Sequence, residues 1–328
     1  MKSRRLGWTD LDFTRVGLGT WAIGGGDWRF SWGPQDDEQS IATIHRALEV
    51  GINWVDTAAV YGLGHAEEVV GRAIAGLSDP PYIATKCGRR WDSAGEIYGD
   101  LRAESLIEEA ENSLKRLGIS TIDLFQIHWP DPESMIEEAW TAMDRLVESG
   151  KVRYAGVSNF NVGQMQRIPG RPRLASLQPP YSMLRPDVEA AVLPYCLQAG
   201  IGVIVYSPMQ KGLLTGKVTR EWVEAIPPDD HRRHDEMFLE PLLGLHMALA
   251  QQLHEIADRS GHTLPQLAVA WTLRRPEVTA AIVGARRPDQ IAETATAGEW
   301  DLSDEDLAEV ERLLEDYRSR RKEVIRSA

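Results

Sequence analysis

Short apolar segments rich in β-branched residues alternate with amphipathic helical segments along almost the whole chain. Eight segments have the composition of strands: RVGLGTW (15–21), NWVDTA (53–58), YIATKCG (82–88), IDLFQIHW (122–129), YAGVSNF (154–160), ASLQPPYS (175–182), GVIVYSP (202–208) and AAIVGA (280–285). Several are nearly continuous apolar runs, which is typical of strands that are covered on both faces. The pattern therefore predicts a parallel sheet with helices packed against it.

The helical segments carry recognisable start and stop signals. Residues 36–51 begin with acidic side chains and end at Gly51, and residues 103–118 place acids early, bases late and end at Gly118. Further helical patterns occupy 132–151, 185–200, 263–276, 286–298 and 302–324, with an extra one at about 239–259. Residues 1–15, with a turn at Thr9 and Asp10, are expected to form a hairpin that closes one end of a barrel.

Eight strands, most of them followed by a helix, predict one (β/α)8 barrel domain over residues 1–328. A doubly wound open sheet is the alternative, because it shows the same alternation. The chain has no linker, no shift in composition and no glycine-rich dinucleotide fingerprint after its first strand, and these features favour the barrel. The long segment 209–235 is expected to be a functional loop.

Composition excludes several classes of function. The formal net charge of -13 disfavours nucleic acid as a partner, and no apolar run is long enough to span a membrane. The charged N-terminus is not followed by an apolar run, so no secretory signal is expected. Cys87 and Cys196 are expected to be buried thiols of a cytoplasmic protein. The eight histidines form no metal-binding pattern, and His231 and His234 are expected at a solvated surface; the sequence does not indicate the oligomeric state.

Four polar residues stand at or just after successive predicted strand ends. Asp56 ends the second strand and Tyr61 follows it, while Lys86 and His128 lie near the ends of the third and fourth. In a barrel these ends meet at one face, so the four side chains are expected to converge. Taken singly, each has a structural alternative: a strand cap, a turn aromatic, a lysine extended to solvent and a core histidine.

This set of side chains is suited to proton transfer. An ammonium group beside a phenol favours the phenolate and is expected to lower the pKa of Tyr61, and a carboxylate holds the ammonium group charged. An imidazole can hydrogen-bond a substrate oxygen. The four residues therefore predict a site that gives a proton to, or takes one from, a carbonyl or alcohol oxygen.

The chain resembles the aldo-keto reductase superfamily along nearly its whole length, and it is most similar to the bacterial branch of general stress and inositol-cluster reductases. The matching stretches are GLGTWAIGG, DTAAVYGLGHAEEVVG, IATKCG, SLKRLGISTIDLFQIHWPDP, GKVRYAGVSNF, QPPYSML, GLLTGK and IVGARRPDQIAE. The resemblance implies that Tyr61 is the general acid, that Lys86 and Asp56 tune it, and that His128 orients the carbonyl group. It also implies a nicotinamide cofactor, NADPH or alternatively NADH, and a small carbonyl or sugar substrate.

The resemblance further implies where this cofactor lies. Its carboxamide would bind Ser158, Asn159 and Gln178, and its nicotinamide ring would stack on Tyr206. The rest of the dinucleotide would contact Ser207, Gly212, Leu213, Gly216 and Lys217 at the pyrophosphate, Gly284 and Arg286 at the 2′-phosphate, and Gln290 and Glu293 at the adenine. Thr294 departs from the asparagine that the family often has there. Independently, Arg286 and Arg287 precede a helix whose free N–H groups would favour an anion, although both arginines could simply be solvated.

Tryptophan is unusually frequent, with 11 residues, more than either Phe or Tyr. Five of them fall in or beside segments expected to be loops after strands, which predicts an aromatic-lined pocket. The resemblance implies that Trp21, Trp91 and Trp129 line the substrate site, with Trp28 and Trp32 less clearly placed.

Two other functions remain open from the sequence. A cofactor-binding regulatory subunit with little turnover, like the potassium-channel β subunits of the superfamily, would keep the same barrel. A metal-dependent barrel hydrolase would need clustered His, Asp or Glu side chains, which the sequence does not show.

Overall fold

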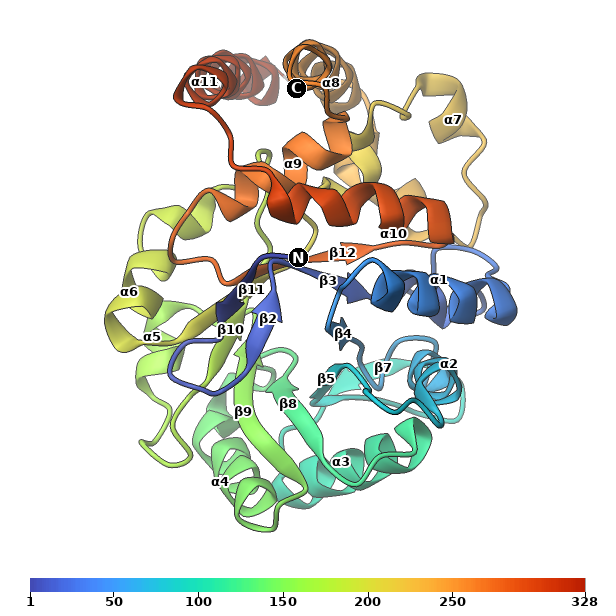
Figure 1. The fold of residues 1–328 in the computed structure, drawn as a ribbon, viewed down its shortest axis with the longest axis vertical. Helices are drawn as coiled ribbons and strands as arrows, with labels where there is room; N and C mark the ends of the chain where they lie inside the picture. The colour runs from blue at the N-terminus through green and yellow to red at the C-terminus, as the bar shows by residue number, and fades with distance from the viewer. Residues whose placement is uncertain (328) are drawn as a thin grey trace.

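The computed structural model describes residues 1–327 and shows eight parallel strands closed into a barrel (Figure 1). In chain order the strands are β3 (Val16–Gly19), β4 (Trp54–Asp56), β5 (Tyr82–Cys87), β8 (Ile122–Ile127), β9 (Val152–Ser158), β10 (Ser176–Gln178), β11 (Gly202–Val205) and β12 (Ala280–Gly284). Each strand pairs in parallel with the next, and β12 pairs with β3 to close the barrel. The predicted barrel is confirmed, and the open doubly wound sheet is excluded.

Helices cover the outside of the barrel. Those that follow the strands are α1 (Asp37–Glu49), α2 (His65–Ile74), α3 (Ala103–Leu117), α4 (Ile136–Glu148), α5 (Val162–Gln166), α6 (Val192–Ala199), α9 (Leu264–Leu273) and α10 (Pro288–Ala295). The additional helices are α7 (Arg220–Glu224), α8 (Leu242–Arg259) and α11 (Asp304–Ser327). Helices α8 and α11 pack side by side outside the barrel, as Figure 1 shows. Among residues 1–327 no helix combines the length and apolarity that crossing a membrane requires.

Three local predictions differ from the structure. The helix expected over 185–200 is interrupted, because α6 begins only at Val192, two residues before Pro194. A helix starting earlier would place that proline in its interior, where the ring clashes with the preceding turn. A short antiparallel hairpin, β6 (Arg89–Trp91) and β7 (Ile97–Gly99), was not anticipated.

The third difference concerns residues 209–235, which were expected to form a loop. The segment contains helix α7 and two short 3-10 helices, η4 (Gln210–Thr215) and η5 (His231–His234). The remaining 3-10 helices of the described chain are η1 (Trp21–Gly24), η2 (Glu133–Met135), η3 (Asp187–Glu189), η6 (Glu236–Phe238) and η7 (Thr296–Glu299). The segment is therefore an ordered part of the barrel rim.

The N-terminal hairpin closes the floor of the barrel, as predicted. Strands β1 (Ser3–Arg5) and β2 (Asp12–Thr14) pair antiparallel, and Leu6, Leu11 and Phe13 are fully buried against the inward-facing side chains of the strands. The rings of Phe13 and Trp54 stack with centroids 4.5 Å apart. The interior is thus filled from below, which leaves the carboxyl ends of the strands as the open face.

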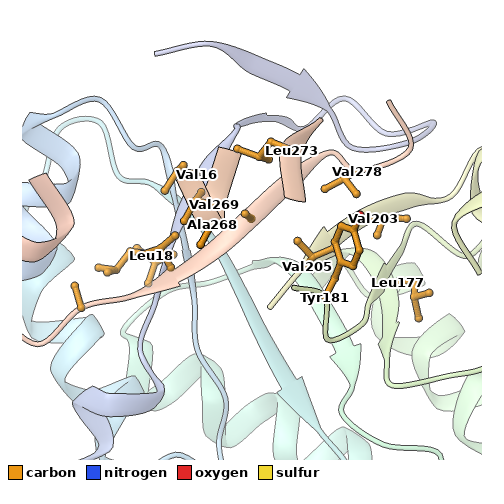
Figure 2. Close-up of a cluster of buried hydrophobic side chains, with 14 of the residues drawn as sticks. Val16, Leu18, Leu177, Tyr181, Val203, Val205, Ala268, Val269, Leu273 and Val278 are labelled. Carbon is orange, nitrogen blue, oxygen red and sulfur yellow. The ribbon is translucent and has the colours of Figure 1, made fainter. Parts of the chain in front are cut away.

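A second apolar layer lies between the strands and the helices. Figure 2 shows Val16 of β3 and Val205 of β11 within the cluster to which Val269 of α9 also belongs. Both cysteines, Cys87 and Cys196, are buried and unpaired as expected, and burial raises the pKa of each thiol. These two layers fix the strands, and with them the positions of the residues at their ends.

The fit between Gly17 and Trp54 provides a test of the barrel interior. A Cβ atom at Gly17 would lie 2.1 Å from the Trp54 ring, so we expect Gly17→Ala to lower the free energy of unfolding by about 1–3 kcal/mol. Gly170→Ala is the matched control, because nothing lies within 4 Å of the added atom, and it should change stability by less than about 0.5 kcal/mol. Urea unfolding of both variants measures the difference, and equal stabilities would contradict this packing.

Candidate active site

Asp56, Tyr61 and Lys86 meet at the open end of the barrel. Asp56 ends β4, Lys86 lies near the end of the neighbouring β5, and Tyr61 is in the turn that leads to α2. The Lys86 Nζ atom donates to Asp56 Oδ1 at 2.6 Å and to the Thr57 carbonyl at 2.8 Å. It lies 3.3 Å from the Tyr61 hydroxyl oxygen. The ammonium group is therefore shared between the carboxylate and the phenol.

Burial dominates the electrostatics of this trio. It lowers the pKa of Lys86 and raises the pKa of Asp56, in each case against the attraction of the partner charge. Burial and the Asp56 charge raise the pKa of Tyr61 well above its ordinary value. The expectation that the ammonium group lowers the pKa of Tyr61 is thus wrong for this state, because loss of solvent outweighs it. Tyr61 is a protonated phenol.

His128 follows β8 directly and faces the same site. Its ring meets the Tyr61 ring edge-on, with centroids 5.9 Å apart, and its backbone N–H donates to the Cys87 carbonyl at 2.9 Å. Burial, Lys86 and Arg89 hold the pKa of His128 well below its usual value, so the imidazole is neutral. A neutral ring in this place can hydrogen-bond an oxygen atom without adding a charge.

A cavity of about 1290 Å³ opens over these residues. Its lining includes Asp56, Tyr61 and His128, and it extends past Tyr206 to Gln290 and Glu293, close to the start of α10. The lining is strongly aromatic, with Trp21, Trp28, Phe30, Trp32, Trp129 and Trp222. Lys86 lies behind Tyr61, fully buried, and does not line the cavity.

The residues expected at the nicotinamide end form one hydrogen-bonded group. Tyr206 donates to Asn159 Oδ1 at 2.8 Å, and Asn159 Nδ2 donates to the Ser158 hydroxyl at 3.0 Å. Ser158 donates to the Gln178 carbonyl at 2.8 Å, and Gln178 Nε2 donates to Asp56 Oδ2 at 2.8 Å. All these residues line the cavity. The group thus links the Tyr206 side of the cavity to the buried carboxylate.

The residues expected farther along the dinucleotide are only partly brought to the cavity. Those that line it are Ser207, Gly212, Lys217, Gly284, Arg286, Gln290 and Glu293. Leu213 and Gly216 do not, and Leu213 is buried behind the rim. At Gly284 an added Cβ would have no atom within 4 Å, so the wall there is open. The shape and the donors of the cavity fit an extended dinucleotide.

The two arginines before α10 are already engaged. Arg286 donates to the side chain of Gln35 at 2.7 Å, to the Trp32 carbonyl at 3.0 Å and to the Pro34 carbonyl. Arg287 pairs with Asp289. The backbone N–H groups of both arginines are also occupied, because the Gln290 side chain accepts from them. An anion at this end would have to compete with these contacts.

The tryptophans are arranged differently from the prediction. Trp21 stacks on Tyr61 with centroids 6.2 Å apart, and it lines the cavity together with Trp129. Trp91, on β6 of the hairpin, does not line the cavity, although Arg89 of the same strand and Ile97 of β7 do. Trp222 was missed, since it lies on α7, in the segment read as a loop.

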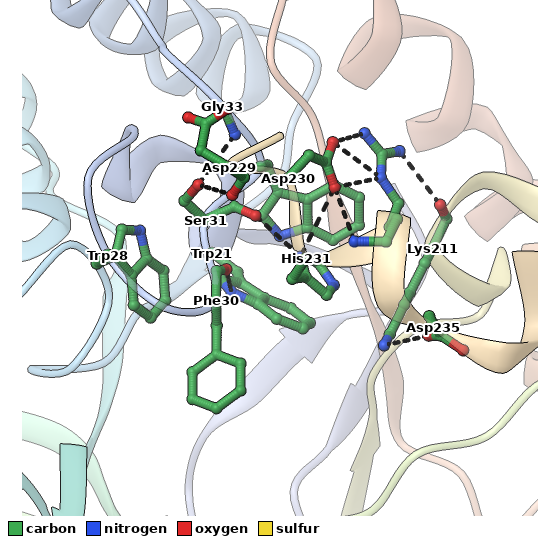
Figure 3. A network of polar contacts seen from close by, with 12 residues as sticks. Trp21, Trp28, Phe30, Ser31, Gly33, Lys211, Asp229, Asp230, His231 and Asp235 are labelled. Atoms are coloured by element: carbon green, nitrogen blue, oxygen red, sulfur yellow. Dashed lines mark hydrogen bonds and ion pairs between the residues drawn. The ribbon is translucent and has the colours of Figure 1, made fainter. Parts of the chain in front are cut away.

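Two distant segments meet over the rim, and we call this contact the clasp: residues 30–33 after β3 and residues 229–232 after β11. The Ser31 hydroxyl donates to the Asp229 carbonyl at 2.6 Å, and the Ser31 carbonyl accepts from His231 (Figure 3). His231 was expected at a solvated surface, but its side chain is only 9% exposed. The prediction was wrong because the rings of Trp21 and Trp32 cover it, both with centroids 4.9 Å away.

Comparison with known proteins identifies the protein family to which this chain belongs. The model of the aldo/keto reductase family matches residues 15–315, so the chain belongs to this family of NAD(P)H-dependent carbonyl oxidoreductases. Within residues 1–327, no three His, Cys, Asp or Glu side chains are grouped as a metal site would require.

Three bacterial proteins are among the relatives of this chain, and the prediction of a bacterial branch is confirmed. The chain is 40% identical to Aldo-keto reductase YhdN of Bacillus subtilis (strain 168), over 94% of this chain and 92% of that protein. It is 35% identical to the NADH-specific methylglyoxal reductase of Escherichia coli (strain K12), over 96% and 99%. Among solved structures it is similar to the glycerol dehydrogenase of Gluconobacter oxydans, with 38% identity, a TM-score of 0.87 and coverage of 96% and 95%.

The buried carboxyl group of Glu109 lies against Gly88, the residue that follows β5, and it predicts a pH dependence of stability. Both carboxyl oxygens of Glu109 lie within 3.2 Å of the Gly88 backbone nitrogen, and burial raises the pKa of Glu109 to about 8. The folded protein therefore holds a proton here that the unfolded chain releases near its ordinary pKa. The stability from this group is complete at lower pH and is lost as the pH rises toward about 8.

We expect the free energy of unfolding of the wild type to fall between about pH 5 and pH 8 relative to Glu109→Gln, by up to about 1.4 kcal/mol for each pH unit. Urea unfolding at several pH values measures this slope. Glu108→Gln is the control, since Glu108 is exposed and paired with Arg90. The same slope in wild type and Glu109→Gln would contradict a proton held at Glu109.

Proposed function

We propose that the protein catalyses the reversible reduction of a small aldehyde or ketone to the alcohol, with Tyr61 as the proton donor. The observation that carries the proposal is the Tyr61 hydroxyl, which borders a large cavity and lies 3.3 Å from a buried ammonium group. A bound nicotinamide dinucleotide would supply the hydride. The chain itself has to bind and orient the carbonyl group and deliver the proton.

Each side chain then has a distinct task. The carbonyl oxygen would accept hydrogen bonds from the Tyr61 hydroxyl and the neutral His128 ring. As negative charge develops on that oxygen, Tyr61 would release its proton to it. Lys86 would stabilise the resulting phenolate, and Asp56 would keep the ammonium group charged and in place. In the reverse direction the phenolate would take the proton of the alcohol.

The coenzyme would lie along the cavity. Ser158, Asn159, Gln178 and Tyr206 would hold its nicotinamide end near Tyr61, and the lining residues from Ser207 to Glu293 would hold the rest. Within this proposal, Arg286 favours NADPH, because its guanidinium group lines the far end of the cavity, as does that of Arg287. The relative named as NADH-specific supports the opposite preference, so the two coenzymes have to be compared directly.

The substrate is proposed to be a small oxygenated carbonyl compound or the corresponding polyol. Two relatives support this class by their names, a methylglyoxal reductase and a glycerol dehydrogenase. The aromatic lining around Tyr61 would cover the carbon skeleton, while His128 and Tyr61 would fix the reacting oxygen.

Tyr61→Phe tests the proton donor. It removes the phenolic proton and keeps the ring, so kcat for methylglyoxal and glyceraldehyde should fall about 10²–10⁴-fold. Loss of the absorbance of the reduced coenzyme measures the rate, and oxidation of glycerol tests the reverse direction. The control is Tyr98→Phe, because Tyr98 is an exposed tyrosine of the β6–β7 hairpin. Tight coenzyme binding with no turnover by the wild type would favour the regulatory subunit instead.

Arg286→Ala tests the coenzyme preference. Loss of this guanidinium group should weaken NADPH binding about tenfold and leave NADH binding within about twofold, since only NADPH carries the 2′-phosphate. Isothermal titration calorimetry with both coenzymes gives the two dissociation constants. Arg287→Ala is the matched comparison, because Arg287 also lines the cavity but is paired with Asp289, and it should weaken NADPH binding less than Arg286→Ala does. Equal losses for both coenzymes would mean that Arg286 only supports the loop of Trp32 and Gln35.

A further inference from the structure

Two polar atoms of the clasp are buried and have no partner in the protein. They are Trp32 Nε1 and His231 Nε2, and both residues line the cavity above Tyr61. The His231 side chain is 91% buried, counted from its 9% exposure. Buried polar atoms are almost always hydrogen-bonded, so two unpaired atoms in one cavity wall indicate a group that binds there.

The protonation of His231 is fixed by its neighbours. Its Nδ1 atom lies 2.9 Å from the Ser31 carbonyl oxygen, which can only accept, so Nδ1 carries the proton. Burial, with Lys211 and Arg232 nearby, lowers the pKa of His231, while Asp230 lies 3.9 Å from Nδ1 and acts in the opposite sense. The ring is neutral, and Nε2 is therefore a hydrogen-bond acceptor. Trp32 Nε1 can only donate.

The two atoms lie close to the reaction centre but outside it. Trp21 links them to the proposed proton donor, because its ring stacks both on Tyr61, with centroids 6.2 Å apart, and on His231, with centroids 4.9 Å apart. Trp32 packs edge-on against both Trp21 and His231. This corner of the cavity wall is therefore aromatic, and Trp32 and His231 contribute one hydrogen-bond donor and one acceptor to it.

The nearby charges do not favour an anion. Lys211 pairs with Asp235 at 2.7 Å, and Arg232 pairs with Asp230, so both cations are neutralised within the rim. A phosphate or carboxylate would also find the lone pair of His231 Nε2 opposed to its own oxygens. A hydroxyl group, by contrast, can donate to His231 and accept from Trp32 at the same time.

We propose that Trp32 Nε1 and His231 Nε2 form a hydroxyl-binding subsite in the rim of the cavity. The inference rests on the proposed function, which brings two hydroxylated ligands to this cavity. The hydroxyl group belongs either to a ribose of the coenzyme or to a polyhydroxy substrate. These two sources share the same chemistry and are separated by experiment.

Three substitutions isolate the subsite. In His231→Asn the amide nitrogen replaces Nδ1 and still reaches the Ser31 carbonyl, but nothing replaces Nε2. In His231→Gln the amide takes the place of Nε2 instead. Trp32→Phe removes the donor and retains a ring. Ser31→Ala is the control for loosening of the clasp, because it removes the hydroxyl contact to Asp229 and leaves both subsite atoms intact.

Two measurements identify the source of the hydroxyl group. Calorimetry gives the dissociation constants of NADPH and NADH without turnover, and steady-state rates give the ratio of kcat/KM for glyceraldehyde over propanal. If the hydroxyl group is a ribose hydroxyl, His231→Asn and Trp32→Phe should weaken both coenzymes about three- to tenfold and leave the ratio unchanged. If it belongs to the substrate, the ratio should fall by the same factor with unchanged coenzyme binding. In either case His231→Gln should show a smaller decrease in coenzyme affinity or in the kcat/KM ratio than His231→Asn.

The subsite is overturned if both variants stay within twofold of the wild type in both measurements, or if Ser31→Ala reproduces their losses. If the wild type binds a coenzyme but reduces no aldehyde, the proposed reaction is contradicted. The coenzyme dissociation constants of the variants then still test whether the subsite binds a ribose hydroxyl. A wild type that binds neither coenzyme and reduces neither aldehyde overturns both proposals.

Discussion

The buried ion pair between Lys86 and Asp56 is the interaction on which the arrangement of the surrounding site residues depends. Both side chains are almost completely buried, and removing charges from water is costly unless the geometry is close and every remaining lone pair is satisfied. The protein meets this demand with a 2.6 Å contact, the Thr57 carbonyl and the side-chain amide of Gln178. These groups come from β4, β5 and β10 or from the turns that follow them. The closed barrel with its fixed register holds them together, and the buried clusters of the floor and the outer layer keep the strands in that register.

The same pair connects the proposed proton donor, Tyr61, with the rest of the cavity. From Asp56 a continuous series of hydrogen bonds runs through Gln178, Ser158 and Asn159 to Tyr206. Asn159 also donates to the His128 carbonyl at 3.0 Å. A network whose members are all satisfied is rigid, and it positions side chains from several strands as one unit. In the proposed reaction this rigidity would hold the hydride source and the proton donor at a constant separation.

What the sequence predicts well is local in origin. The strand ends at Asp56, Lys86 and His128 follow from apolar runs, and a barrel topology brings such ends together without further information. The burial of His231 could not be predicted, because its covering rings come from residues about 200 positions earlier and its own neighbours are polar. The raised pKa of Tyr61 was missed for a related reason, since charge proximity can be inferred from sequence whereas loss of solvent cannot.

The raised pKa of Tyr61 gives the ammonium group a different role from the one that proximity suggests. In the resting state Lys86 and a neutral phenol interact weakly, and burial keeps the proton on the phenol. In the proposed reaction the proton leaves, and the oxygen would then be an anion 3.3 Å from a cation in surroundings of low dielectric constant, where attraction is strong. An interaction that is weak before proton transfer and strong during it lowers the barrier rather than the energy of the bound state. In the proposed reaction, the burial that raises the pKa of Tyr61 would therefore also strengthen the attraction of Lys86 for the phenolate.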